Sequence, residues 1–155
     1  MQHEILGEVK TGDCDPYAAV ATIPYDSYEI QIGMVTLGDA PLEATLELAA
    51  NVVRRLAELD QVAKRIATRE LRDSYNNIWN EYDEQQEDGT FKTVSKPQLS
   101  ESEFQEKLLL YSVTVSGDQE VEFYYDEDDM FLGHFVLVNS RNGIDLSDAS
   151  ANLAG

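Results

Sequence analysis

The hydrophobic residues of this chain change their spacing twice, and that order constrains the fold more than any other feature. Apolar and polar side chains alternate over residues 17–23 and again over 28–34, with a turn at Pro24–Ser27 between the two runs. A period of two on both sides of a turn predicts a β-hairpin. A shorter strand is expected ahead of it, over residues 5–10. The first part of the chain is therefore predicted to form antiparallel strands.

From Asp39 onward the apolar residues recur every three or four positions, which is the spacing of one helix face. Asp39 and Pro41 form an ordinary helix start. The pattern continues as far as Ile78, and Asp60 has the side chain of a second N-cap. We therefore predict two helices with a break between Glu58 and Asp60, although one long bent helix has the same periodicity.

Two segments show neither period. Residues 83–99 are polar and are expected to form a mobile loop, while residues 147–155 are expected to form a frayed tail. Between them, Ser100 and Glu103 have the spacing of a capping box, in which the Ser hydroxyl and the Glu carboxylate each accept a backbone N–H. A short helix over residues 101–107 is therefore predicted.

The alternating pattern returns after this helix. Residues 109–115 and 121–125 alternate on either side of a Ser-Gly-Asp turn, which is the clearest hairpin signal in the sequence. A further strand is predicted over residues 131–138. It is followed by Asn142–Gly143, one of the strongest hairpin dipeptides, so a short strand over residues 144–146 is expected to pair with it.

The order of strands, helices and strands is typical of the α+β class. We predict a single α+β domain over residues 1–155, with an antiparallel sheet made from the N- and C-terminal hairpins and two or three helices packed on one face. A chain of this length can bury about 70% of the surface that its unfolded form exposes. No internal repeat or long linker divides it.

The charge and composition of the chain exclude several kinds of partner. It has 30 Asp and Glu against 11 Lys and Arg, a formal net charge of −19, so it lacks the excess cations with which a free-standing nucleic-acid-binding protein neutralises phosphates. Its uncharged stretches are about half as long as a bilayer span. Cys14 is the single cysteine, which agrees with a reducing compartment. We expect a cytoplasmic protein with no nucleic-acid partner, no membrane partner and no cofactor.

The densest group of acidic residues lies in and after the return strand of the clearest hairpin. If Val121, Phe123 and Tyr125 point inward, the residues between them point outward together. Such carboxylates can bind a divalent cation, line a solvated turn or attract a basic protein, and the spacing lacks the register of an EF-hand, which does not favour a metal site. The residues expected to contact a basic protein partner are Glu120, Glu122, Tyr124, Asp126, Asp128 and Asp129.

Two other features have more than one interpretation. His134 lies in a predicted strand and could serve as an acid or base beside a carboxylate, although such a histidine is more often a structural hydrogen-bonding residue. Six of the eleven cationic residues lie between positions 54 and 72, where they form either an anion site or the solvated face of the helices. The chain contains no phosphate-binding Gly-rich loop, nucleophile elbow or zinc-protease motif, so we do not expect an enzyme.

Three short motifs carry a resemblance to other proteins. They are Asn76-x-x-Trp79, Ser102-Glu103-Phe104, and Asp129-Met130-Phe131-x-Gly133-His134. With these motifs the chain resembles a family of small, functionally uncharacterised bacterial proteins, over most of its length. The resemblance implies an α+β fold and a bacterial cytosolic protein, and it assigns no chemistry. The family often has Trp at the position of Leu132, beside the most distinctive residues.

The leading hypothesis for the function is an immunity or inhibitor protein that neutralises a basic toxin or effector by surface occlusion, by analogy with other small acidic bacterial proteins. Long-range attraction would be followed by burial of a few aromatic anchors. The alternative hypothesis is an enzyme or small-ligand-binding protein with a site around His134 and nearby carboxylates. A concave site that joins His134 to Asp128 or Asp129 favours the alternative, whereas a buried His134 away from any cavity favours the leading hypothesis.

Overall fold

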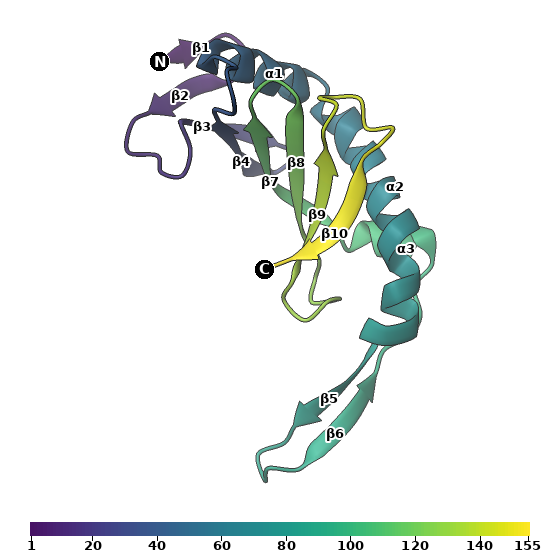
Figure 1. The fold of residues 1–155 in the computed structure, drawn as a ribbon. Coiled ribbons are helices and arrows are strands. Elements are labelled where there is room, and N and C mark those ends of the chain that lie inside the picture. Colours follow the sequence, from purple (N-terminus) through teal and green to yellow (C-terminus); the bar gives the residue numbers. More distant parts are fainter.

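The computed structural model describes all 155 residues and contains an eight-stranded sheet, a separate two-stranded hairpin and three α-helices (Figure 1). The large sheet consists of β1 (Gln2–His3), β2 (Gly7–Thr11), β3 (Ala19–Tyr25), β4 (Tyr28–Val35), β7 (Leu109–Ser116), β8 (Glu120–Asp126), β9 (Phe135–Ser140) and β10 (Ser150–Ala154). The helices are α1 (Leu42–Arg54), α2 (Leu56–Ser74) and α3 (Glu101–Glu106), with a π-helical turn η1 at Tyr75–Trp79. The small hairpin consists of β5 (Glu81–Gln85) and β6 (Phe91–Ser95).

The strand order in the large sheet is β1-β2-β3-β4-β7-β8-β9-β10. All neighbours pair antiparallel except β4 and β7, which run parallel with Gln31 opposite Ser112. Parallel neighbours need a long crossover connection, and here the crossover carries all the helices and the small hairpin. The mostly antiparallel sheet with its helices confirms the predicted α+β class.

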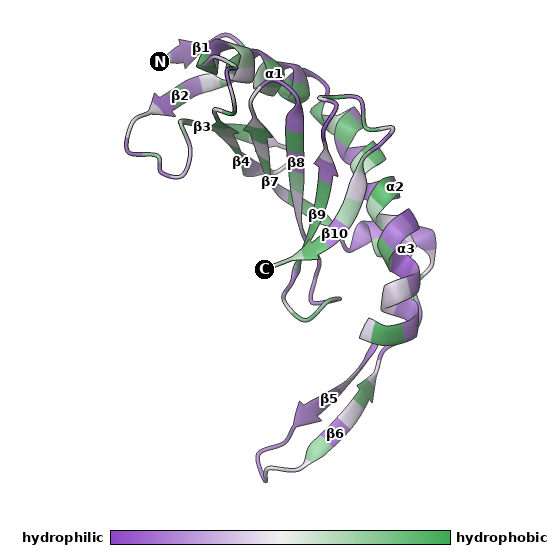
Figure 2. Ribbon diagram, in the orientation of Figure 1, coloured by the Kyte–Doolittle hydropathy of each residue, from purple (hydrophilic) through white to green (hydrophobic).

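The helices cover one face of the large sheet, and the hydrophobic core lies between the two layers (Figure 1). Along β8, Val121, Phe123 and Tyr125 are fully buried and point to this layer, as predicted. Small residues such as Ala49 and Ala63 let the helices approach the sheet closely. Figure 2 shows the resulting alternation of hydrophobic and hydrophilic residues along the strands. None of the helices combines the length and apolar content needed to cross a membrane.

The break between the first two helices lies at Arg55, and the predicted break between Glu58 and Asp60 is wrong. Arg55 has non-helical dihedral angles (φ −118°, ψ 22°), so α2 begins at Leu56 and Asp60 lies inside it. Apolar residues face the same core on both sides of the break. The periodicity therefore continues through it and does not indicate where the helix axis changes direction.

The segment expected to be a loop over residues 83–99 contains most of the β5–β6 hairpin, which projects away from the body of the protein (Figure 1). Polar interactions connect its strands: the Thr93 hydroxyl donates to Asp83 over 2.8 Å, and the Lys96 ammonium lies 5.7 Å from the centre of the Tyr82 ring. Because both faces of this hairpin meet solvent, its sequence needs no apolar alternation. That explains why the pattern did not predict strands.

The end of the chain also differs from expectation. The last strand is β10, over Ser150–Ala154 and paired with β9, so a strand at 144–146 and a frayed tail at 147–155 are wrong. The backbone N–H of Ala151 donates to Glu70 on α2 over 3.0 Å, which attaches this edge strand to the helical layer. Its sequence, Ser-Ala-Asn-Leu-Ala, has too little apolar contrast to predict a strand.

Other predicted elements are present. The hairpins β3–β4 and β7–β8 form in the expected segments. The capping box of α3 is complete, because the Ser100 hydroxyl accepts the Glu103 N–H and the Glu103 carboxylate accepts the Ser100 N–H. The strand predicted from residue 131 begins only at Phe135, because the residues before it form a tight turn.

Candidate functional site

The face of the large sheet opposite the helices carries a cluster of aromatic side chains. Tyr111 of β7, Tyr124 of β8 and Phe135 of β9 lie side by side, with ring centres 6.0 to 6.3 Å apart. No helix covers them (Figure 1). Rings in such tilted and edge-to-face arrangements stabilise one another, so this aromatic cluster is a preformed apolar surface on the uncovered sheet face.

A β-bulge places Tyr111 in this cluster. In the pairing of β7 with β8, Leu110 lies opposite Tyr125 and Ser112 lies opposite Tyr124, so Tyr111 is an extra residue on β7. Leu110 and Val113 are buried under the helices. Without the bulge, strict alternation would put Tyr111 on the same side as Val113. The bulge thus turns Tyr111 to the uncovered face, which is a known use of bulges near functional sites.

Tyr17 extends the aromatic surface toward β4. Its ring lies directly over Gly33, where a Cβ atom would overlap the ring. Gly33 is opposite Thr114 of β7, which is opposite Glu122 of β8. The absence of a side chain at position 33 is therefore what allows Tyr17 to lie flat against the sheet, in the direction of the cluster.

Two carboxylates border the cluster on β8, as the alternation predicted. Glu120, Glu122 and Tyr124 all point to the uncovered face and are half-buried. The Tyr124 hydroxyl donates to Glu122 over 3.4 Å. Burial raises the pKa of Glu122, and the neighbouring charge of Glu120 adds to this effect. Burial, followed by the charge of Glu122, raises the pKa of Tyr124 to about 12.

An acidic hollow adjoins the aromatic cluster at the end of β8. It has a volume of about 380 Å³, and its walls include Tyr111 and Phe135 from the cluster. Its other lining residues are Asp126, Glu127, Asp129, Gly133 and His134. We call this cavity the acidic hollow. It brings three carboxylates next to two partly exposed aromatic rings, a combination that suits a cationic group.

The turn that forms the hollow is organised around a buried carboxylate. Glu127 is almost inaccessible and accepts the backbone N–H groups of Asp129 and Phe131. Burial raises the pKa of Glu127, although these two N–H groups oppose the shift. Asp128 and Asp129 both adopt left-handed backbone conformations, with φ values of 50° and 58°. These conformations direct the turn back toward Phe135, so that the acidic residues face the start of β9.

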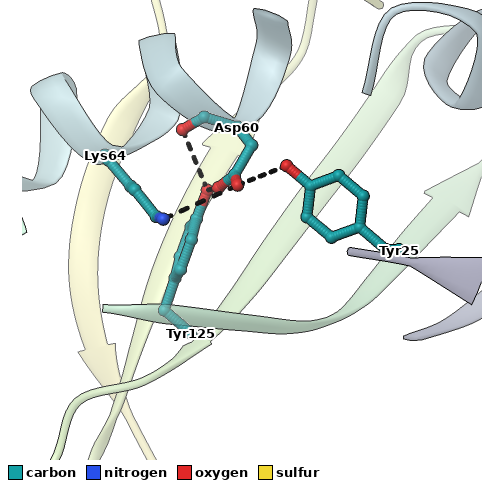
Figure 3. A network of polar contacts seen from close by, with 4 residues as sticks. All are labelled: Tyr25, Asp60, Lys64 and Tyr125. Carbon is teal, nitrogen blue, oxygen red and sulfur yellow. Dashed lines mark hydrogen bonds and ion pairs between the residues drawn. The ribbon is translucent and has the colours of Figure 1, made fainter. Parts of the chain in front are cut away.

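A buried polar network fixes β8 against the helical layer (Figure 3). The Asp60 carboxylate of α2, only 3% exposed, accepts a hydrogen bond from Tyr125 of β8 over 2.7 Å and one from Tyr25 of β3 over 2.6 Å. Lys64, one helical turn further along α2, lies 3.6 Å from the same carboxylate. Burial and the Asp60 charge raise the pKa values of both tyrosines well above their ordinary range. Because Tyr124 and Tyr125 are consecutive, this network also determines where the half-buried Tyr124 lies.

Comparison with known proteins identifies a family. A family model described as "Uncharacterized protein conserved in bacteria (DUF2262)" matches residues 3–150. The chain belongs to this family. No curated protein and no solved structure matches it. The match therefore supports the expectation that the chain belongs to an uncharacterised bacterial family. It does not test the short motifs, and it assigns no chemistry to any residue.

The motif residues of this family member converge in space. Trp79 at the end of η1 packs edge-to-face on Phe131 and on His134, with ring centres 5.6 and 5.8 Å apart. Asn76 exchanges two hydrogen bonds with the backbone of Leu99, which joins η1 to the segment before α3. These residues hold the acidic turn against the end of the helical layer. The short motifs thus have a structural role in positioning the hollow.

The remaining predicted site residues have distinct surroundings. Asp126 and Asp129 line the acidic hollow, whereas Asp128 points away to an ion pair with Lys107 at 3.1 Å. His134 lines the hollow beside Asp129, and its Nδ1 atom is 2.9 Å from the backbone oxygen of Gly155. It makes no hydrogen bond to an Asp or Glu side chain. No group of three or more His, Cys, Asp or Glu side chains is arranged to hold a metal ion.

Sequence patterns missed several residues of the site. Tyr111, Phe135, Tyr17 and Glu127 are not among the residues predicted to contact a partner. A bulge, a cross-strand neighbour and a ring lying over a glycine leave no periodic signal. The position of Gly33 inside a predicted strand was the one available signal, because such a glycine often marks a close approach of another group.

Proposed function

We propose that this chain is a non-enzymatic binding protein of the bacterial cytosol, and that it docks a basic protein on the uncovered sheet face. The most specific form of the proposal is an immunity or inhibitor protein that occludes a basic toxin or effector. One observation carries the proposal: the acidic hollow and the aromatic cluster are contiguous, since Tyr111 and Phe135 belong to both.

The chemistry of this surface suits a Lys or Arg side chain of the partner. The carboxylates of Asp126 and Asp129 offer charged acceptors inside the hollow. The rings of Tyr111 and Phe135 can interact with the same cation through their π faces, a contribution of about 0.5–2 kcal/mol depending on desolvation. A partner residue that inserts here would become a hot spot, because such residues are enriched at the desolvated centre of interfaces.

The aromatic cluster supports docking of a whole protein surface around that anchor. Tyrosine and phenylalanine rings are enriched at interface cores, and here they lie on a broad sheet face. A stable interface buries about 800 Å² on each partner. The formal net charge of −19 would attract a basic partner over long distances, and such steering can raise association rates to about 10⁸–10⁹ M⁻¹s⁻¹ at low salt.

A differential capture experiment tests this proposal. The wild-type protein, the double variant Asp126→Asn/Asp129→Asn and the control Glu47→Gln are immobilised and exposed to a lysate of the native host. Glu47 is an exposed acidic residue on α1, on the helical side of the molecule. A basic protein retained by the wild type and the control, and lost with the double variant, is the expected partner.

Association kinetics with that partner then test the mechanism. We expect the double variant to associate at least about tenfold more slowly, and wild-type association to slow with added salt, because the lost carboxylates contribute to steering. Glu47→Gln should leave the rate within about twofold of wild type. An association rate indifferent to both salt and the double variant would refute the electrostatic mechanism.

A second candidate function is an enzyme or small-ligand-binding protein with its site in the same hollow. His134 lies beside Asp129 in a concave site, which is the arrangement expected from the sequence to favour this alternative. Docking is kept as the first proposal because no hydrogen bond joins His134 to an Asp or Glu side chain and because the hollow is continuous with the aromatic cluster. The variant His134→Gln distinguishes the two functions. Under the docking proposal it retains most of the partner affinity, because the carboxylates and rings remain. If the substitution His134→Gln abolishes a measurable turnover or the binding of a small molecule, and docking is unchanged, the second function is supported instead.

A further inference from the structure

A separate cleft lies on the helical side of the molecule, between α2 and the loop that joins β9 to β10. Its volume is about 650 Å³, which is within the range of small-molecule sites. Leu59, Val62 and Ile66 of α2 form one apolar wall, and Ile144 and Leu146 of the loop form the other. Because α2 packs against β9 and β10 from the helical layer, this cleft is on the opposite side of the sheet from the aromatic cluster.

Three arginines of this otherwise acidic protein line the same cleft. Arg55 lies at the break just before α2, Arg65 and Arg69 lie within α2, and Glu58 lines the same wall. Arg55 forms a two-point ion pair with Glu58, and Arg69 lies 3.7 Å from Glu70. Arg65 has neither a hydrogen bond nor an ion pair within the protein. Its guanidinium therefore retains all of its five donors for a ligand.

The loop side of the cleft is fixed by internal hydrogen bonds. The Ser140 hydroxyl lies 2.9 and 3.2 Å from the backbone oxygens of Gly143 and Asp145. The Asp145 carboxylate accepts the Ser147 N–H at 3.0 Å, which lowers the pKa of Asp145. Hydrogen bonds within the loop thus hold Asp145 in place in its ionised form, and with Glu58 it offsets part of the arginine charge. The cleft does not have to be assembled by its occupant.

The positive charge continues beyond the cleft. Arg65 and Arg69 also border a neighbouring depression of about 430 Å³, whose lining adds one more cation, Arg72, and two carboxylates, Asp73 and Glu101. The solvated-face interpretation of these cations explains their exposure, and it does not explain why they border a cleft with apolar walls on both sides. Guanidinium groups bind planar carboxylates and phosphates through paired hydrogen bonds, which an ammonium group does not reproduce.

We propose that this cleft binds a small molecule that carries an anionic oxygen group on an apolar body. The anionic group would lie at Arg65, with Arg55 and Arg69 beside it, and the apolar body would lie between Val62 and Ile144. This site is independent of the docking surface on the sheet, since the two share no residue. The chemical class is an amphiphilic carboxylate, sulfonate or phosphate monoester.

Calorimetric titration with sodium octanoate tests the proposal, with acetate and octan-1-ol as probes that carry only the anion or only the tail. Octanoate should bind more tightly than either. Arg65→Gln should weaken octanoate binding at least about tenfold, because a charge-assisted contact is lost. Lys92→Gln removes the same charge on the distant β5–β6 hairpin and should change the affinity less than about twofold.

The position of the ligand is checked by amide chemical shifts, which should change at residues 144–147 and along α2 on addition of octanoate. Arg65 is exposed, so its substitution should leave the unfolding midpoint unchanged. The proposal is overturned if octanoate does not bind, if octan-1-ol binds equally well, or if Arg65→Gln and Lys92→Gln have the same affinity. Shifts confined to the uncovered sheet face would also overturn it.

Discussion

The buried network around Asp60 allows a quantitative prediction for the variant Tyr125→Phe. Tyr125 is completely buried, and its hydroxyl donates to the Asp60 carboxylate over 2.7 Å. A hydrogen bond to a charged group contributes about 1.5–3 kcal/mol. Removal of the hydroxyl leaves one oxygen of a buried carboxylate without its donor, so we expect a loss near the upper end, about 2–3 kcal/mol. The aromatic ring itself remains in place.

Urea unfolding, followed by circular dichroism, measures this loss. Thermal unfolding is a second measurement: for a chain of this size, 1 kcal/mol corresponds to about 2–4 °C in Tm, so Tm should fall by about 4–12 °C. The denaturant slope should not change, because the same surface is exposed on unfolding. Tyr111→Phe is the matched control: its hydroxyl has no partner within the protein, and its loss should cost less than about 0.5 kcal/mol.

The second tyrosine of the network, Tyr25, allows a further test of the same account, through its own substitution and through the double variant. Tyr25 donates to the other oxygen of Asp60 and is only half-buried, so water can replace its hydroxyl, and Tyr25→Phe should cost about 1 kcal/mol. Because both hydroxyls share one carboxylate, the double variant should depart from additivity by about 0.5 kcal/mol or more. If Tyr125→Phe unfolds within 0.5 kcal/mol of wild type (about the error of such measurements), the account of this network is wrong.

Two further predictions concern pH and packing. The pKa values of Tyr25 and Tyr125 are raised in the folded state, so the unfolded chain loses these protons at a lower pH than the folded chain does. The free energy of unfolding should therefore be constant up to about pH 10 and then fall as the pH rises toward the folded-state pKa values. A urea midpoint that is unchanged up to about pH 12 would contradict this. Gly33→Ala should cost about 1–3 kcal/mol in urea unfolding, because the added methyl displaces the Tyr17 ring. The same substitution in a Tyr17→Ala background should cost much less, and equal costs in both backgrounds would show that the ring does not lie there.

The sequence allowed the orientation of β8 to be predicted because that strand has one buried and one uncovered face. Val121, Phe123 and Tyr125 had to be buried together, so Glu120 and Tyr124 had to point outward. Strict alternation is a strong signal wherever one sheet face is covered and the other is not. The capping box of α3 was equally predictable, since it depends on two residues three positions apart.

The aromatic cluster could not be predicted by the same rule. Its three rings come from three strands, and alternation within a strand does not indicate which strands become neighbours. The bulge at Tyr111 also reverses the side on which that residue lies, so strict alternation counted from Val113 puts it on the wrong face. Predicting the cluster would require the register between strands, which depends on the tertiary packing of the whole sheet.

The Asp60 network shows a different limit. An aspartate near an expected helix start is usually a cap, because its carboxylate accepts backbone N–H groups at the first turn. Here the helix starts at Leu56, and Asp60 instead receives hydroxyls from strands 35 and 65 residues away in sequence. No local pattern distinguishes these two uses of an aspartate. Only the positions of the strands relative to α2 decide between them.

The acidic turn combines like charges with unusual backbone conformations, which allows the proposed docking role to be tested against a structural one. Asp126 and Asp129 line the hollow with like charges close together, and Leu132 is an exposed β-turn residue with a φ of 55°, a conformation that few leucines adopt. Unfavourable local features of this kind persist where function requires them. Asp126→Asn/Asp129→Asn should therefore keep or slightly raise the free energy of unfolding, by up to about 0.5 kcal/mol, while it weakens docking. Asparagine keeps the oxygen that accepts the Asp128 N–H, so the turn retains that contact. A loss of more than about 1 kcal/mol would mean that these carboxylates serve the fold, and would remove the argument that they form a docking surface.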